Sequence, residues 1–200
     1  MFLGFLVTEQ GIEIDHAQTK AIQELPSPQS KKDVQRLTRK MVVMAYFIYR
    51  HTDHLKHFFN VIKKAKAFEW TAEYEETFLA IKYYLVLPLI LKSPQLGNLL
   101  CMYDAVSKLA VNVVLLKLGL NGSQLLVYYV GKAMLPTDQN YTMPENMSLA
   151  LQMASKKLRP YFQAYQVNVL TNVPLRAILP RLELSRRLIK WVVELSEFDL

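Results

Sequence analysis

The sequence predicts a mixed α+β fold (α/β in its second half), in which a sheet packs against helices after a small hairpin and a group of helices. Within residues 99–135, three runs rich in Val, Leu and Tyr follow one another, as is typical of strands. The Asn121-Gly122 pair between two of these runs is a strong hairpin signal. The element order that follows, βββαβα, indicates a mixed sheet with helices against it.

The first 87 residues predict a hairpin and a helical array. Apolar runs at residues 2–7 and 12–14 flank a turn that ends at Gly11. Apolar side chains then recur at helical spacing, and capping residues or prolines mark the helix ends. We expect helices over residues 17–24, from a cap at Ser30, over residues 54–64 and from a cap at Thr71.

The second half of the chain begins after a predicted linker at residues 88–97, which contains Pro88, Pro94 and Gly97. Residues 98–200 then form the second domain. After the three strands we expect a helix over residues 143–162, a strand over 167–171, a short helix over 174–179, a helix over 184–195 and the cut-off start of a fifth strand at 198–200.

Composition bounds the function classes. The chain is 52% hydrophobic and 20% charged, so it can bury a core. A net charge of +7 is compatible with a polyanionic partner. The single cysteine, Cys101, excludes an internal disulfide and is expected to be a buried structural thiol. No apolar run approaches the ~18 residues of a membrane span, so we expect a soluble intracellular protein, in cytoplasm or nucleus, without a membrane partner.

Two carboxylates are candidate site residues. Asp104 is the only acid in residues 99–135 and ends an apolar strand, where it is either a site residue or a solvated turn residue. Glu145 opens the long helix, and its spacing from Thr142 also fits a capping box, which alone explains a Glu there. The residues by themselves leave both alternatives open.

The strand order, with acids in the first strand and at the start of the first long helix, resembles ribonuclease H. The match is closer still to gypsy-type LTR retrotransposon polyproteins, and it runs through the whole chain. It is carried by the phrases FLGFLVTEQGIEI, AIQELPSPQSKKDVQRLT, FIYRHTD, FFNVIKKAKAFEWTAEYEETFLAIKYYL, VYYVGKAML, LRPYFQAYQVNVLT and RRLIKWVVELSEFDL.

The resemblance implies two domains. Residues 1–87 would be the end of a reverse transcriptase, with its hairpin and thumb/connection helices. Residues 98–200 would be a ribonuclease H-like domain, truncated at its C-terminus. The polymerase palm would precede Met1, so we expect a retroelement fragment without polymerase activity. Its expected partners are an RNA–DNA hybrid or other nucleic acid and the rest of the retroelement polyprotein.

The resemblance also implies a catalytic site. Ribonuclease H cleaves the RNA strand of an RNA–DNA hybrid with two Mg²⁺ ions held by carboxylates. Asp104 matches the first catalytic and metal-binding position and Glu145 the second. Asn172 stands at the third, where the family has Asp, and the fourth position would lie beyond Leu200.

Charge counting predicts that this set is insufficient. Two divalent ions ~4 Å apart repel by roughly 4 kcal/mol in water and ~16 kcal/mol at an effective dielectric constant of 20. Asp104 and Glu145 offset only half of the metal charge. We therefore expect that the two-metal state does not form and that hybrid cleavage is negligible.

A basic surface supports a second hypothesis. Seven cations fall on or between the predicted helices of the second domain and could contact a nucleic-acid backbone, or could simply form a solvated helix surface. They are Lys156, Lys157, Arg159, Arg181, Arg186, Arg187 and Lys190. The alternative to an inactivated nuclease is thus a non-catalytic nucleic-acid-binding or assembly module, and a third possibility is a product without a selected function.

Overall fold

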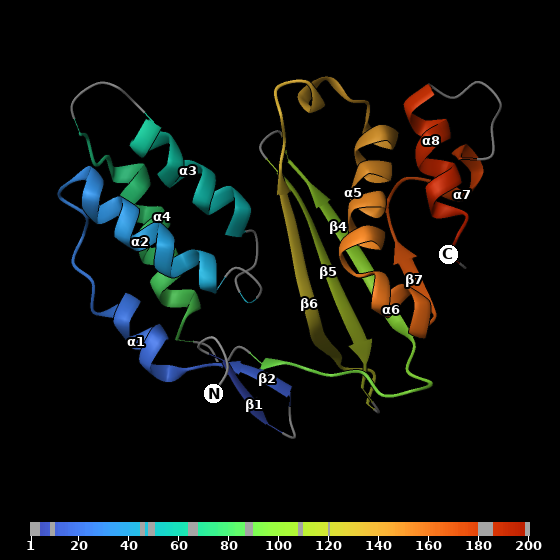
Figure 1. Ribbon diagram of the computed structural model, residues 1–200, viewed down its shortest axis with the longest axis horizontal. Helices are drawn as coiled ribbons and strands as arrows, with labels where there is room; N and C mark the ends of the chain where they lie inside the picture. Colours follow the sequence, from blue (N-terminus) through green and yellow to red (C-terminus); the bar gives the residue numbers. More distant parts are fainter. Residues whose placement is uncertain are drawn as a thin grey trace. The chain divides into compact units, whose positions relative to one another are not determined.

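The computed structural model describes residues 5–8, 11–44, 47, 51–63, 68–86, 90–107, 110–119, 121–179 and 186–198. The chain divides into two compact units, Met1–Ser93 and Pro94–Leu200, whose elements are labelled in Figure 1. Among the described residues, no helix is both long and apolar enough to cross a membrane.

The first unit contains a three-stranded antiparallel sheet. Strand β1 (Phe5–Thr8) pairs with β2 (Gly11–Ile14), which pairs with β3 (Ile90–Leu91). The structure differs here from the expected linker over residues 88–97, because that stretch supplies β3. A Cβ at Gly11 would lie 2.1 Å from the Leu91 carbonyl oxygen, so the close approach of β2 and β3 requires glycine.

The described residues of the first unit also form four helices: α1 (His16–Gln23), α2 (Lys31–Val43), α3 (His51–Lys63) and α4 (Ala72–Tyr84). Ser30 caps α2 as predicted, because its side chain accepts a hydrogen bond from the Asp33 backbone. Thr71 holds the capping position of α4, but its buried hydroxyl has no partner among the described residues. The helix therefore begins at the predicted cap residue, but without the side-chain hydrogen bond expected of a cap. Instead, the Trp70 indole donates to Glu75 in the first turn of α4.

The second unit contains a four-stranded sheet of order β6-β5-β4-β7. Three antiparallel strands come from residues 99–135, as predicted: β4 (Leu100–Val106), β5 (Ala110–Leu118) and β6 (Gln124–Ala133). The fourth, β7 (Val167–Leu170), pairs parallel to β4. Gly122, with φ of 72°, lies between β5 and β6, where the Asn-Gly pair predicted a turn.

The helices of this unit are α5 (Met143–Lys157), α6 (Arg159–Ala164), α7 (Leu175–Ile178) and α8 (Arg186–Leu195), with the short 3-10 turn η1 (Asp138–Asn140) before α5. One helix over residues 143–162 was expected, but the chain changes direction at Leu158. Pro160 has no backbone N–H and its ring clashes with the preceding turn, so α5 ends and α6 starts afresh.

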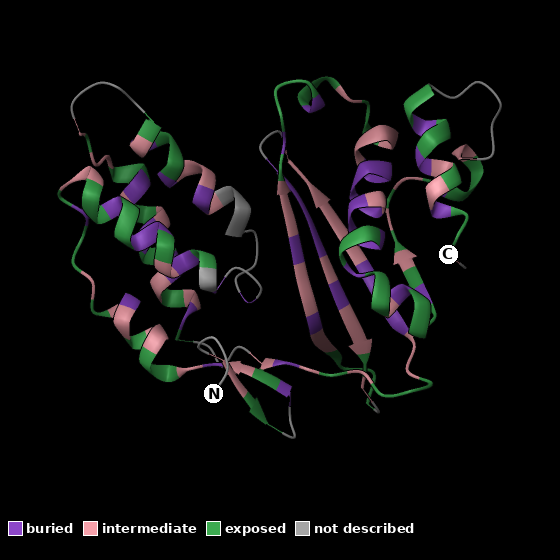
Figure 2. Cartoon of the chain, viewed as in Figure 1, coloured by how far each residue is buried: buried purple, intermediate pink, exposed green. Residues whose placement is uncertain are grey.

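Helix α5 covers one face of the sheet. Its buried side chains, among them Ala150 and Ala154, pack with Leu100 and Met102 of β4 in one hydrophobic core, and the buried positions of the helix and strands are visible in Figure 2. The predicted mixed fold is confirmed. At the C-terminal end, Phe198 lies in a bend and packs on Phe162 at 5.5 Å between ring centroids. Residues 199 and 200 of the expected fifth strand lie outside the described residues.

Candidate functional site

Asp104 lies on the face of β4 that α5 covers. Side chains alternate along a strand, so Asp104 shares its face with Leu100 and Met102, both fully buried. Val113, also buried, is its partner on β5. Burial raises the pKa of Asp104, and no basic side chain forms an ion pair with it in the described part of the chain. Asp104 is therefore a half-buried acid and not a solvated turn residue.

The topology brings the three predicted metal-binding positions to one end of the sheet. The parallel register pairs Tyr103 with Leu170, so Asn172 follows β7 at the end where Asp104 lies. Helix α5 starts at this end as well. Strand β6 runs in the same direction as β4, and the chain passes from the end of β6 into α5. Figure 1 shows the start of α5 beyond the ends of β4 and β6.

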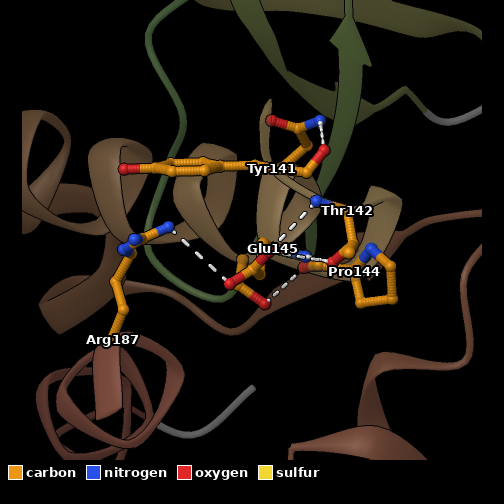
Figure 3. Close-up of polar contacts among 7 residues, drawn as sticks. Tyr141, Thr142, Pro144, Glu145 and Arg187 are labelled. Atoms are coloured by element: carbon orange, nitrogen blue, oxygen red, sulfur yellow. Dashed lines mark hydrogen bonds and ion pairs between the residues drawn. The ribbon is translucent and has the colours of Figure 1, made fainter. Parts of the chain in front are cut away.

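Glu145 is occupied by local contacts. Its Oε2 accepts hydrogen bonds from the Thr142 backbone N–H and hydroxyl, both at 3.0 Å, in a capping box. Its Oε1 lies 3.7 Å from a guanidinium nitrogen of Arg187 on α8. Figure 3 shows the carboxylate between Thr142 and Arg187. The capping role expected as the alternative is confirmed.

Glu145 lies on the side of α5 that faces α8. Gln152 and Lys156, seven and eleven residues further on, lie on the same stripe of the helix. Both contact Glu194 of α8, at 2.7 Å and 2.8 Å. The side of α5 that packs in the sheet core is different, and includes Ala150 and Ala154. Glu145 thus belongs to the seam between α5 and α8.

The donor set at this end of the sheet does not fit a pair of Mg²⁺ ions. Asp104 supplies one carboxylate, Asn172 a neutral amide, and Glu145 is neutralised by Arg187. Within the described residues, no group of three or more His, Cys, Asp or Glu side chains could hold a metal ion. Mg²⁺ prefers several hard oxygen ligands, carboxylates above all, and the described residues do not bring them together.

The predicted nucleic-acid-binding residues fall into two groups. Lys156 and Arg187 pair with Glu194 and Glu145 of the seam, at 2.8 Å and 3.7 Å. Arg159 of α6 pairs with Glu197, beyond the end of α8, at 3.5 Å. The other group is not committed in this way. Lys157 donates to the Gly131 carbonyl at 3.0 Å. Arg186 and Lys190 are exposed, and the charge of Lys190 contributes to the lowered pKa of Glu194. Arg181 lies outside the described residues.

Sequence reasoning missed a third acid at this end of the sheet, Asp138. Its side chain is only 7% exposed, accepts from the Leu135 N–H and lies 3.6 Å from Lys132. Burial opposes the charged form, but hydrogen bonds from Leu135 and Tyr141, with the charge of Lys132, lower the pKa of Asp138. No sequence pattern marks it, because its partners come from the strand before and the loop after it.

Tyr141 connects this acid to the seam. Its hydroxyl donates a hydrogen bond to the Asp138 carboxylate. The Arg187 guanidinium lies 4.1 Å from the Tyr141 ring centroid, and the Trp191 ring packs edge-on at 6.1 Å between centroids. A cation over an aromatic face is attracted to it. Arg187 is thereby held between Tyr141 and Glu145, which fixes α8 against the start of α5.

Replacing Glu145 tests its structural role. Glu145→Ala removes the acceptor for Thr142 and the partner of Arg187, so we expect the free energy of unfolding to fall by about 1 kcal/mol. Glu145→Gln keeps a capping acceptor and should lose less. Urea unfolding followed by circular dichroism measures both. A gain in stability for either variant would contradict this role, because it would show a carboxylate held under strain.

The pKa of Asp104 predicts a specific pH dependence. Folding raises the pKa of Asp104 above the unfolded value of 3.8, so below pH 3.8 the acid is protonated in the folded and in the unfolded protein. At higher pH the acid ionises freely in the unfolded protein, whereas burial disfavours the charged form in the folded protein. Stability should therefore fall as pH rises from 3.8 through the folded pKa. Asp104→Asn should remove this loss and be more stable than wild type at pH 7 but not at pH 3. Equal stability of the two proteins at both pH values would contradict the assignment.

The sequence of the chain is similar to that of known proteins. Residues 98–198 match the RNase H-like domain found in reverse transcriptase. The chain is 29% identical over 199 residues to the retrovirus-related Pol polyprotein from transposon 412 of Drosophila melanogaster, covering 99% of the chain and 16% of the relative. It is 28% identical to that from transposon 297 of the same organism, covering 99% of the chain and 18% of the relative.

The fold is shared with solved reverse transcriptases. The foamy viral protease-reverse transcriptase matches with a TM-score of 0.75 in complex with an RNA/DNA hybrid, at 20% identity over 98% of this chain and 27% of that chain. A dRH form in complex with double-stranded DNA matches at 0.76, also at 20% identity, over 98% and 35%. The chain spans about a sixth of the curated polyproteins it matches. It belongs to the family of RNase H-like domains found in reverse transcriptase.

Proposed function

We propose that the unit Pro94–Leu200 binds nucleic acid of the RNA–DNA hybrid class and does not cleave it at a significant rate. The observation that carries this proposal is the donor set at the end of the sheet. There, the ribonuclease H-like sheet presents Asp104 with an amide at 172 and a carboxylate at 145 that is paired with Arg187.

Binding is supported by the family and by charge. RNase H-like domains act on nucleic acid, and a solved structure of similar fold holds an RNA/DNA hybrid. The chain carries a net charge of +7. Arg186 and Lys190 lie four residues apart on the exposed side of α8, so both cations can reach one phosphate backbone.

Absence of cleavage follows from the metal requirement. RNase H-like domains are generally Mg²⁺-dependent, and closely spaced divalent ions need several negative ligands around them. Freeing Glu145 for a metal would leave Arg187 without its carboxylate and remove an acceptor from the first turn of α5. The seam between α5 and α8 therefore competes with metal binding.

We further assign the chain to the gypsy-type class of retroelement, and residues 1–87 to the thumb/connection region of its reverse transcriptase. The similarity to Pol polyproteins across 99% of the chain supports this assignment. The natural partner would then be the remainder of such a polyprotein.

The full chain tests the proposal directly. A labelled RNA–DNA hybrid should shift in a binding assay in a salt-dependent way, and it should stay intact after incubation with Mg²⁺ or Mn²⁺. Arg186→Gln with Lys190→Gln should weaken the shift. Asp104→Asn serves as the matched control: cleavage above background that disappears in this variant would contradict the proposal, as would a failure to bind the hybrid at low salt.

A further inference from the structure

A strip of lysines and tyrosines follows the β6 edge of the sheet. We define the cationic–aromatic strip by five residues: Tyr128, Lys132, Lys157, Tyr161 and Tyr165. The first two lie four residues apart on β6, which places them on the same face of the strand. Lys157 is the last residue of α5, Tyr161 lies on α6 and Tyr165 follows the end of α6. Ring contacts from Tyr128 to Tyr161 and from Tyr161 to Tyr165 bring the tyrosines of the strip together.

Of the two lysines of the strip, Lys132 alone forms an ion pair with a carboxylate of the described residues. Lys157 donates to the Gly131 carbonyl of β6 at 3.0 Å, which holds its ammonium beside the strand. Lys132, the next residue along β6, lies 3.6 Å from Asp138, and 38% of its side chain is exposed. Burial and the charge of Lys132 lower the pKa of Lys157. Two ammonium groups against one carboxylate leave a net positive charge that a phosphate group would neutralise.

The three tyrosines continue the strip away from the lysines. The rings of Tyr128 and Tyr161 lie 6.3 Å apart between centroids, and those of Tyr161 and Tyr165 lie 6.4 Å apart. All three rings are half-buried, packed on the core from one side. The Tyr165 hydroxyl donates to the Pro94 carbonyl at 3.1 Å, which fixes the end of the row. The rings are therefore held in place by the fold and still partly accessible.

We infer that the cationic–aromatic strip binds a single strand of nucleic acid, with phosphates at Lys132 and Lys157 and unpaired bases against the tyrosine rings. Single-strand binding surfaces combine these two features, because every base has a face that stacks on an aromatic ring while cations follow the backbone. Paired bases cannot reach half-buried rings in this way. The inference goes beyond the proposed function, because the β6 edge is the opposite edge from β7 and the contact needs neither a metal nor a hybrid.

Fluorescence anisotropy of a labelled oligothymidylate with the full chain, in EDTA, tests the inference. The double variant Lys132→Gln with Lys157→Gln should bind at least about tenfold more weakly at 0.1 M salt. Because two phosphate contacts are lost, the slope of log K against log salt should become shallower by about 1.4. The comparison variant, Arg186→Gln with Lys190→Gln, removes the same charge from α8 and should weaken oligothymidylate binding far less than the strip variant does.

The aromatic half of the strip is tested separately. Tyr161→Leu should weaken oligothymidylate binding at least about fivefold, whereas Tyr161→Phe, which keeps the ring, should not. Thermal unfolding by circular dichroism shows whether each variant is folded. If Tyr161→Leu does not fold, the double lysine variant still tests the inference.

Three outcomes would overturn the inference: unchanged binding in the lysine pair, equal weakening in the α8 variant, or equal affinity for duplex DNA of the same length. Binding of the RNA–DNA hybrid is measured in parallel for the same variants. Loss of hybrid binding in the α8 variant alone bears on the proposed function and leaves the inference about the strip unaffected.

Discussion

The register of β4 is the constraint on which the second unit depends. Leu100 and Met102 must face α5 to fill the core, and strand alternation then places Asp104 on the same face, one step nearer the strand end. A shift by one residue would expose both apolar side chains and turn the acid outward. The position of Asp104 is thus fixed by packing, and its raised pKa is a consequence of that packing.

The second organising feature is the seam between α5 and α8. Glu145, Gln152 and Lys156 present one stripe of α5 to Arg187 and Glu194. Side chains that would serve an active site or a nucleic-acid surface here hold two helices together. Hydrogen bonds from Lys156 and then Gln152 lower the pKa of Glu194, so this acid stays ionised in the seam. Glu145 and Glu194 of this unit therefore stabilise the packing of α5 against α8.

Much of this fold was predictable from local patterns. The strand runs around Asn121-Gly122 and the capping spacing of Thr142 and Glu145 are signals contained within a few residues, and both are confirmed. The end of α5 was not predicted, although Pro160 marks it, because the apolar stripe continues past the break.

The partners of the site residues were beyond sequence reasoning. That Glu145 would meet Arg187, or Lys156 would meet Glu194, depends on how α8 lies against α5 more than thirty residues away. Asp138 differs, because its partners Lys132, Leu135 and Tyr141 are close in sequence, but no residue pattern marks the turn that brings them together. Residue type and spacing locate candidates, whereas tertiary packing decides which charges remain available to a ligand.

The central proposal is that the sheet end at Asp104 does not hold a pair of metal ions. Paramagnetic broadening of backbone amide signals by Mn²⁺, in ¹⁵N-labelled protein, measures this most directly. The account predicts weak, non-saturating broadening spread over exposed carboxylates, unchanged in Asp104→Asn. Selective, saturable broadening of amides around 104 and 172 that Asp104→Asn abolishes would contradict it.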